Sequence, residues 1–173
     1  MPLKTTNELL KILKDEGLVK IYKDENQILF ETDQWECISR LMEGNFPDYK
    51  QIIPKGFTAE AVIERSEFMS AVKLTSVLSS RVNEINIRPH EEGKAIEIFS
   101  ADESAGENDY ILSAKLTGKA KQISFNWKYL NDGLRVLKSE EVYLGLNDES
   151  KPAIIKTVND SSYFYILMPF LKG

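Results

Sequence analysis

A pattern of about 60 residues recurs along this chain and limits its fold more than any other feature. Three residues suited to begin a helix, Thr6, Ser66 and Asn126, stand at intervals of 60 residues. Each can accept a hydrogen bond from a free amide of a first helical turn. Apolar residues follow at helical spacing, as Leu130 and Leu134 do after Asn126. The sequence therefore predicts one structural unit repeated three times.

Strand-like segments follow each predicted helix. Apolar residues alternate at Val142, Leu144 and Leu146, which is typical of a half-buried strand. Polar turns separate three such segments in each copy, with the sequences KDEN, HEEGK and NDESKP after the first of them. A short strand is also expected before the second and third helices, over 59–65 and 121–125. Helices packed on antiparallel sheets make this an α+β fold.

One such unit is too small to bury a good core, whereas two units can share one. The second and third copies are therefore expected to form a complete domain over residues 55–173. The first copy and a linker, residues 1–54, would be half of another domain. The boundary is placed near Lys55 because the stretch GNFPDYKQIIPKGFT has the densest glycine and proline content of the chain.

Composition excludes several classes of protein. The net charge of −5 argues against a generally basic nucleic-acid binder, although a basic face is compatible with it. The only cysteine, Cys37, cannot form an internal disulfide, which favours a reducing, cytoplasmic location. No stretch approaches the roughly 20 apolar residues of a membrane span, so no membrane partner is expected.

No catalytic or metal site can be assembled from the candidate residues. His90 is the only histidine and stands in an acidic turn without suitable partners. Cys37 lies within strand-like alternation, where a cysteine is usually inert. Asp102 and Glu103 lack the spacing of a calcium loop, and no phosphate-binding glycine loop is present. We therefore predict a protein without catalysis, metal or cofactor.

Three stretches resemble one known family in their order and spacing. They are LMEGNFPDYKQIIPK (41–55), FNWKYLNDGLRVL (125–137) and YILMPF (165–170). The chain is similar in these to the bacterial DNA polymerase III β subunit, the sliding clamp. A subunit of that family has three domains of two units each, and two subunits close head to tail into a ring around DNA. This chain resembles its C-terminal part, from the second half of the middle domain onward.

The resemblance implies a hydrophobic groove near the C-terminus for short peptides of partner proteins. Those partners would be the polymerase III catalytic subunit, the clamp loader and other proteins with a clamp-binding motif. The matching positions here are Pro47, Gln51, Ile52, Asn126, Tyr129, Pro152, Ile166, Leu167, Met168, Pro169 and Phe170. The residues by themselves leave another interpretation open, in which Asn126 only caps a helix, Tyr129 only packs, and half of the last strand is core.

Two further surfaces follow from the resemblance. Duplex DNA, bound without sequence preference, would face the helices at Lys11, Lys14, Lys73, Lys128, Arg135 and Lys138. The ring interface of a homodimer would include Val77 and Leu78, with the strand around 110–114 as the edge that pairs across it. Without the resemblance, the basic residues are interpreted as a solvated helix face, and Val77 and Leu78 as residues that only cover the local core.

Two other functions compete with a nucleoid-associated clamp that tethers the replicative polymerase for processive synthesis. A stand-alone protein-interaction module would share the groove but not the replication partners. A metal-dependent nuclease of α+β fold would need acidic residues that converge on one cleft. The acidic residues of this chain are instead spread over its turns, for example at Asp24, Asp102 and Asp148.

Overall fold

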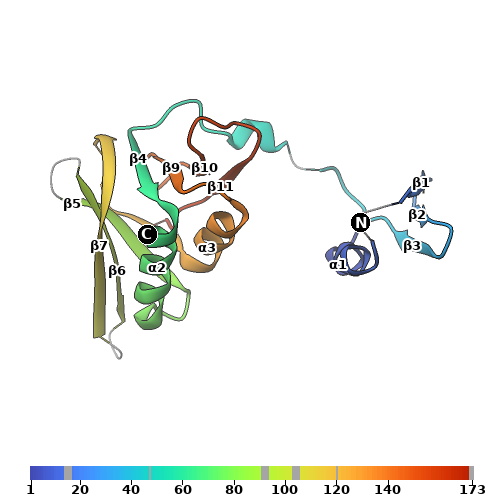
Figure 1. Ribbon diagram of the computed structural model, residues 1–173, viewed down its shortest axis with the longest axis horizontal. Coiled ribbons are helices and arrows are strands. Elements are labelled where there is room, and N and C mark those ends of the chain that lie inside the picture. The colour runs from blue at the N-terminus through green and yellow to red at the C-terminus, as the bar shows by residue number, and fades with distance from the viewer. Residues whose placement is uncertain (14–16, 47, 91–93, 103–105, 120, 172–173) are drawn as a thin grey trace. The chain divides into compact units, whose positions relative to one another are not determined.

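The computed structural model describes residues 1–13, 17–46, 48–90, 94–102, 106–119 and 121–171. It consists of two compact units, Met1–Asp48 and Tyr49–Gly173 (Figure 1). The domain boundary that the sequence places near Lys55 stays a prediction.

The smaller unit contains one helix and one antiparallel sheet. Its elements are α1 (Leu3–Ile12), β1 (Lys20–Lys23), β2 (Gln27–Glu31) and β3 (Glu36–Arg40), and the strands pair in the order β1-β2-β3. Leu9 of α1 and Phe30 of β2 are buried, whereas Ile21 and Ile38 of the sheet are exposed. One helix and three strands thus leave apolar surface uncovered, as expected of half a domain.

The larger unit contains the other two copies of the repeat. The first copy has β4 (Ala59–Glu64), α2 (Arg65–Thr75), β5 (Glu84–His90), β6 (Ala95–Asp102) and β7 (Gly106–Gly118). The second has β8 (Ile123–Asn126), α3 (Trp127–Val136), β9 (Glu141–Leu146), β10 (Ala153–Thr157) and β11 (Phe164–Leu167). Two 3₁₀ turns, η1 (Tyr49–Ile52) and η2 (Ser76–Leu78), complete it. The predicted strand–helix–three-strand unit is therefore confirmed in both copies.

The two copies are interlocked by an exchange of their first strands. The eight strands pair in the order β11-β10-β9-β4-β7-β6-β5-β8, and the printed pairs are all antiparallel. The first strand of one copy, β4, pairs with β9 of the other copy as well as with β7 of its own, and β8 pairs with β5. Each copy thus completes the sheet of its neighbour, so neither could form its full set of backbone hydrogen bonds alone.

Both helices of the larger unit contribute to one hydrophobic core. Phe68 of α2, Leu130 and Leu134 of α3, and Phe125 of β8 are fully buried within a single cluster. The helices contact each other and lie beside one another against the strands (Figure 1). The apolar stripes predicted from sequence thus meet the sheet, as an α+β layer requires.

Two of the three predicted helix starts are wrong. Asn126 caps α3 as predicted, and its Oδ1 accepts a hydrogen bond from Lys128 N at 3.0 Å. The cap of α2 is Glu64 in place of Ser66, because the Glu64 carboxylate accepts from the amides of Ser66 and Glu67. The first helix begins at Leu3, directly after Pro2. Proline fixes φ without needing a hydrogen-bonded amide, which suits a helix start.

The strand β6 of the larger unit carries a buried carboxylate opposite β5. Glu97 is only 7% exposed and accepts two hydrogen bonds from the guanidinium of Arg88, at 2.8 and 2.7 Å. Arg88 is the cross-strand partner of Glu97 and also lies over the ring of Phe99. His90, expected in a turn, is instead the last residue of β5, with Nδ1 3.6 Å from Glu97 Oε2.

Acidification should weaken the larger unit partly through Glu97. The hydrogen bonds from Arg88 lower the pKa of this carboxyl below its ordinary value of 4.5. A lowered folded-state pKa means that the stabilisation is complete above about pH 4.5 and is lost as the pH falls through the folded pKa. Glu97→Gln should therefore be less stable at pH 7 but lose less stability between pH 5 and pH 3 than the unmodified chain.

Urea unfolding at several pH values measures this difference. The chain has two tryptophans, Trp35 and Trp127, one in each unit. In a Trp35→Phe background, fluorescence reports the larger unit alone. Glu149→Gln, at an exposed position, is the control. If Glu97→Gln showed the same pH dependence as this control, Glu97 would not contribute to acid sensitivity.

Candidate functional site

The end of the larger unit packs closely against α3. A side chain on Gly133 would place its Cβ 2.6 Å from Cδ1 of Tyr165, so the ring of Tyr165 fills the space that Gly133 leaves open. The following residue, Ile166, pairs with Ile154 of β10. The absent side chain at Gly133 therefore allows β11 to lie against the helix.

After β11 the chain alternates between buried and exposed residues. Leu167 is 4% exposed and Pro169 is buried, whereas Met168 between them is 57% exposed. The half-buried Phe170 donates its amide hydrogen to the carbonyl oxygen of Ser124 at 2.9 Å. This bond ties the segment after β11 to β8, the strand at the opposite end of the sheet order. Met168 is thus presented to solvent by a fixed backbone.

Tyrosines surround Tyr165 on this surface. Burial raises the pKa of Tyr165, with smaller contributions in the same direction from Asp132, Tyr163 and Tyr129. Tyr129 and Tyr163 are exposed. Tyr129, Asp132, Tyr163 and Tyr165 thus lie close together where α3 meets β11. We call these four residues, together with Ile166, Met168 and Phe170 of β11 and the segment after it, the C-terminal surface.

The remaining predicted groove residues are placed as follows. Asn126 stands next to this surface as the cap of α3, and Pro152 is half-buried immediately before β10. Gln51 and Ile52 are exposed in η1, at the start of the larger unit. Leu167 belongs to the core, in line with the interpretation that part of the last strand only packs. Pro47 lies outside the described residues.

Basic residues from both helices meet in a groove of about 770 Å³ between α2 and α3. Lys73 of α2 and Arg135 of α3, both predicted to face DNA, line this groove together with Arg65. Lys128 lies near it, with Nζ 5.6 Å from the centre of the Trp127 ring. Lys138 is exposed after α3, and Lys11 of α1 pairs with Glu8 at 2.8 Å in the smaller unit. Lys14 lies outside the described residues.

The residues predicted for a ring interface lie in η2. Val77 is 75% exposed and Leu78 is half-buried. The turn packs against β6 and β7, and Asn108 Nδ2 of β7 donates to the carbonyl oxygen of Leu74 at 2.9 Å. The expected sheet edge around 110–114 ends at Ser113, because Ala114 pairs with Ile63 of β4. Among the described strands, the segment from Gly106 to Ser113 pairs only with β6.

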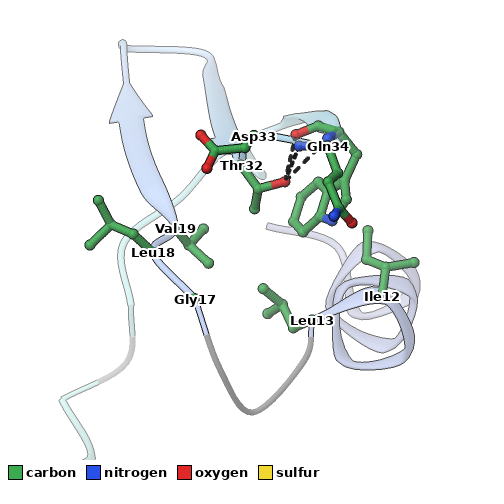
Figure 2. Close-up of a pocket in the computed structure, with 9 residues that line it drawn as sticks. Ile12, Leu13, Gly17, Leu18, Val19, Thr32, Asp33 and Gln34 are labelled. Atoms are coloured by element: carbon green, nitrogen blue, oxygen red, sulfur yellow. Dashed lines mark hydrogen bonds between the residues drawn. The ribbon is translucent and has the colours of Figure 1, made fainter.

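A hollow in the smaller unit was not predicted from the sequence. It has a volume of about 170 Å³ and is bounded by the end of α1, residues 17–19 and the turn at 32–35 (Figure 2). Thr32 Oγ1 accepts hydrogen bonds from the amides of Gln34 and Trp35 and so shapes that turn. The sequence offered no local signal for it, because Leu18 and Trp35, which both line the hollow, lie in different segments of the chain.

The structure offers no support for a metal centre or a membrane segment in the part of the chain that it describes. Within these residues, no three His, Cys, Asp or Glu side chains are grouped so that they could hold a metal ion. No helix among these residues combines the length and the apolar character needed to cross a membrane.

Two family profiles together match nearly the whole chain. The profile of the DNA polymerase III beta subunit central domain matches residues 1–48, and that of its C-terminal domain matches residues 50–171. The chain belongs to the DNA polymerase III beta subunit family. The resemblance stated from sequence is thereby confirmed, and these matches support neither the nuclease nor the unrelated interaction module.

Individual members of the family are also similar to this chain in sequence. The beta sliding clamp of Bacillus subtilis is 32% identical over 175 residues, which cover 98% of this chain and 46% of that protein. The one of Synechocystis sp. is 28% identical over 173 residues and is covered to 44%. The chain thus spans a little under half the length of these relatives.

Solved clamp structures confirm the fold. The sliding clamp of Bacillus subtilis matches with a TM-score of 0.90 at 31% identity, covering 100% of this chain and 46% of that one. A clamp from Bartonella birtlesii bound to griselimycin also matches with a TM-score of 0.90 at 31% identity. The match covers 99% of this chain and 46% of that one. The predicted α+β class, with one complete clamp domain and part of another, is confirmed by these matches.

Proposed function

We propose that this chain is part of a bacterial DNA sliding clamp, which encircles duplex DNA and tethers the replicative polymerase without catalysing a reaction itself. The observation that carries the proposal is the match of two clamp domains, in family order, over residues 1–48 and 50–171. In the full clamp, two subunits would form the ring, and the protein would act in the cytoplasm at the nucleoid.

In this proposal the basic helix faces are directed toward DNA. Lys73 and Arg135 line one groove on the helices of the larger unit, which supports a shared electrostatic role. Contacts to phosphates through lysine and arginine need no base recognition, so a clamp could slide on its DNA. Lys128 and Lys138 are proposed to extend this face, and Lys11 and Lys14 are proposed as DNA-facing residues of the smaller unit. Val77 and Leu78 are proposed to lie at the ring interface, near the open edge of β7.

The C-terminal surface is proposed to bind short peptides of the polymerase III catalytic subunit, the clamp loader and other partners. Met168 would be its centre, because an exposed thioether between buried neighbours can adapt to different apolar anchors. Asn126, Tyr129, Pro152, Ile166, Pro169 and Phe170 are proposed to border it, and Gln51 and Ile52 to contribute from η1. Pro47 is proposed as a further peptide-binding residue. Leu167 is proposed to support this surface from the core.

The proposal predicts that Met168→Ala weakens peptide binding. Burying a methionine side chain is worth about 1.5–3 kcal/mol, and each 1.4 kcal/mol corresponds to about tenfold in affinity. We expect the dissociation constant to rise about tenfold or more. Fluorescence anisotropy of a labelled peptide of the Gln-Leu-x-Leu-Phe type, titrated with the chain, measures it.

Met42→Ala is the matched control for this experiment. Met42 is exposed to a similar degree as Met168 but lies in the smaller unit. We expect its affinity for the peptide to equal that of the unmodified chain. Equal affinities for Met168→Ala and the control, in folded samples, would show that Met168 is not part of a peptide site.

A further inference from the structure

The groove between α2 and α3 has an unusual charge for this protein. Three cationic residues line it, Arg65, Lys73 and Arg135, and its described lining includes no carboxylate. The whole chain, in contrast, carries a net charge of −5. A concave site lined by one sign of charge raises the local concentration of ions of the opposite sign. The groove is therefore suited to an anionic ligand.

These three cations lack a close carboxylate partner, although Arg65 interacts electrostatically with the adjacent Glu64. Among the described residues, none of them forms an ion pair with a carboxylate, whereas Lys11, Lys115 and Lys151 do. Arg65 is instead held in place by neutral groups. Its Nε donates to the carbonyl oxygen of Ser139 at 2.9 Å and its Nη1 to the sulfur of Met69 at 3.2 Å. The positive charge is thus positioned before any ligand arrives.

The groove also contains apolar groups that a simple anion would leave uncovered. Met69 and Trp127 pack against the core while lining the groove, and the exposed Val77 lies in the same wall. Lys128 adds a further cation near the Trp127 ring. The ligand should therefore combine a flat or apolar group with adjacent negative charges.

Duplex DNA and acidic peptides would each use only part of this combination. A duplex keeps its bases stacked inside, so it could contact Lys73 and Arg135 as proposed above but would leave Met69 and Trp127 uncovered. An acidic peptide would likewise use the charges and leave the tryptophan and methionine unfilled. A single strand offers an unpaired base with phosphates on both sides, and aromatic platforms within basic grooves are the usual sites for single strands.

We infer that the α2–α3 groove binds single-stranded DNA, with one unpaired base on Met69 and Trp127 and the flanking phosphates on Arg65, Lys73 and Arg135. This activity goes beyond the encircling of duplex DNA, since it needs no closed ring. On a clamp, it would hold an unpaired template strand next to the helices.

The test compares three labelled probes by fluorescence anisotropy at low salt. They are an oligothymidylate of about 12 nucleotides, which is within the range of single-strand site sizes, an abasic oligomer of the same length, and a duplex of that length. The oligothymidylate is expected to bind at least about fivefold more tightly than the abasic oligomer, given the usual contribution of base stacking. It should also quench Trp127 fluorescence in the Trp35→Phe background.

The double substitution Lys73→Ala/Arg135→Ala should weaken oligothymidylate binding about tenfold or more, because two phosphate contacts are lost. The matched control is Lys115→Ala/Lys151→Ala, which also removes two positive charges, both from exposed lysines that pair with Glu141 and Asp148. This control should bind as the unmodified chain does. All four side chains are exposed, so both variants should fold.

Several results would overturn the inference. Equal affinities for the abasic oligomer or the duplex would show that only phosphates are bound. Equal losses in the two double variants would indicate a general charge effect. Competition by polyglutamate as effective as by oligothymidylate would indicate an acidic-peptide site. The Gln-Leu-x-Leu-Phe titration on the same samples tests the proposed clamp function separately, so failure of one does not imply failure of the other.

Discussion

Replacing Phe125 with alanine should lower the free energy of unfolding of the larger unit by about 3–5 kcal/mol, the usual cost of removing a buried phenylalanine ring. Phe125 is 0% exposed. It lies on β8, the exchanged strand, opposite Ile85 of β5. The substitution would therefore leave a cavity where the two copies of the repeat join.

Urea unfolding followed by Trp127 fluorescence in the Trp35→Phe background measures this loss. Leu171→Ala is the control, because Leu171 is an exposed apolar residue of the same unit. The free energy of unfolding of this control should lie within about 0.5 kcal/mol of that of the unmodified chain. A loss below about 1 kcal/mol for Phe125→Ala would mean that the junction of the two copies is not tightly packed.

Gly118→Ala should destabilise the larger unit by more than about 2 kcal/mol, for two separate reasons. Gly118 ends β7 with φ +81°, a backbone conformation that costs other residues roughly 1–2 kcal/mol. In addition, an alanine Cβ would overlap the carbonyl oxygen of Thr58. That oxygen accepts a hydrogen bond from Lys119 N at 3.0 Å, so it cannot move without breaking the contact between the two segments.

Substitutions at two other glycines distinguish the cost of the backbone conformation from that of the steric overlap. Gly106 has φ +101° but open space around its Cβ position, and Gly56 has open space and no such φ. Gly106→Ala should therefore show the cost of the backbone conformation alone, and Gly56→Ala little or none. The same urea assay applies. If Gly118→Ala were no more destabilised than Gly106→Ala, the overlap with Thr58 would be relieved by a small local shift.

Much of the secondary structure could be predicted from the sequence, because each element has its own local period. The alternation of Val142, Leu144 and Leu146 corresponds to β9, and Leu130 and Leu134 form the buried stripe of α3. Helix starts were less predictable. The Glu64 carboxylate, two residues before Ser66, caps α2, although serine is usually preferred over glutamate at this position.

The pairing of strands could not be predicted from local periods. The exchange that brings β4 beside β9 and β8 beside β5 joins residues far apart in sequence, such as Ile63 and Val142. The ion pair between side chains of neighbouring strands was also not predicted. Glu97 lies among isoleucines in a strand pattern, and only its register opposite Arg88 explains why a carboxylate can be buried there.

The candidate sites were predictable to different degrees. The family resemblance singled out Met168, and the structure shows it exposed between two buried residues. Lys73 and Arg135 could be assigned to helix faces, but not to one groove, because the spacing between α2 and α3 depends on tertiary packing. Arg65 and Trp127 were not singled out at all. Arg65 was assigned to the end of the strand predicted over 59–65, whereas it begins α2, and Trp127 fits the helical pattern after Asn126.

The position of Met168 has an entropic consequence. Its neighbours are fixed by the pairing of Leu167 with Ala153, by the burial and ring of Pro169, and by the bond from Phe170 to Ser124. The backbone here has already lost its freedom during folding. A ligand covering Met168 would therefore lose conformational entropy mainly in its own chain and in one thioether side chain. Such a preorganised surface favours short, flexible partners, which can bind and leave without a rearrangement of the protein.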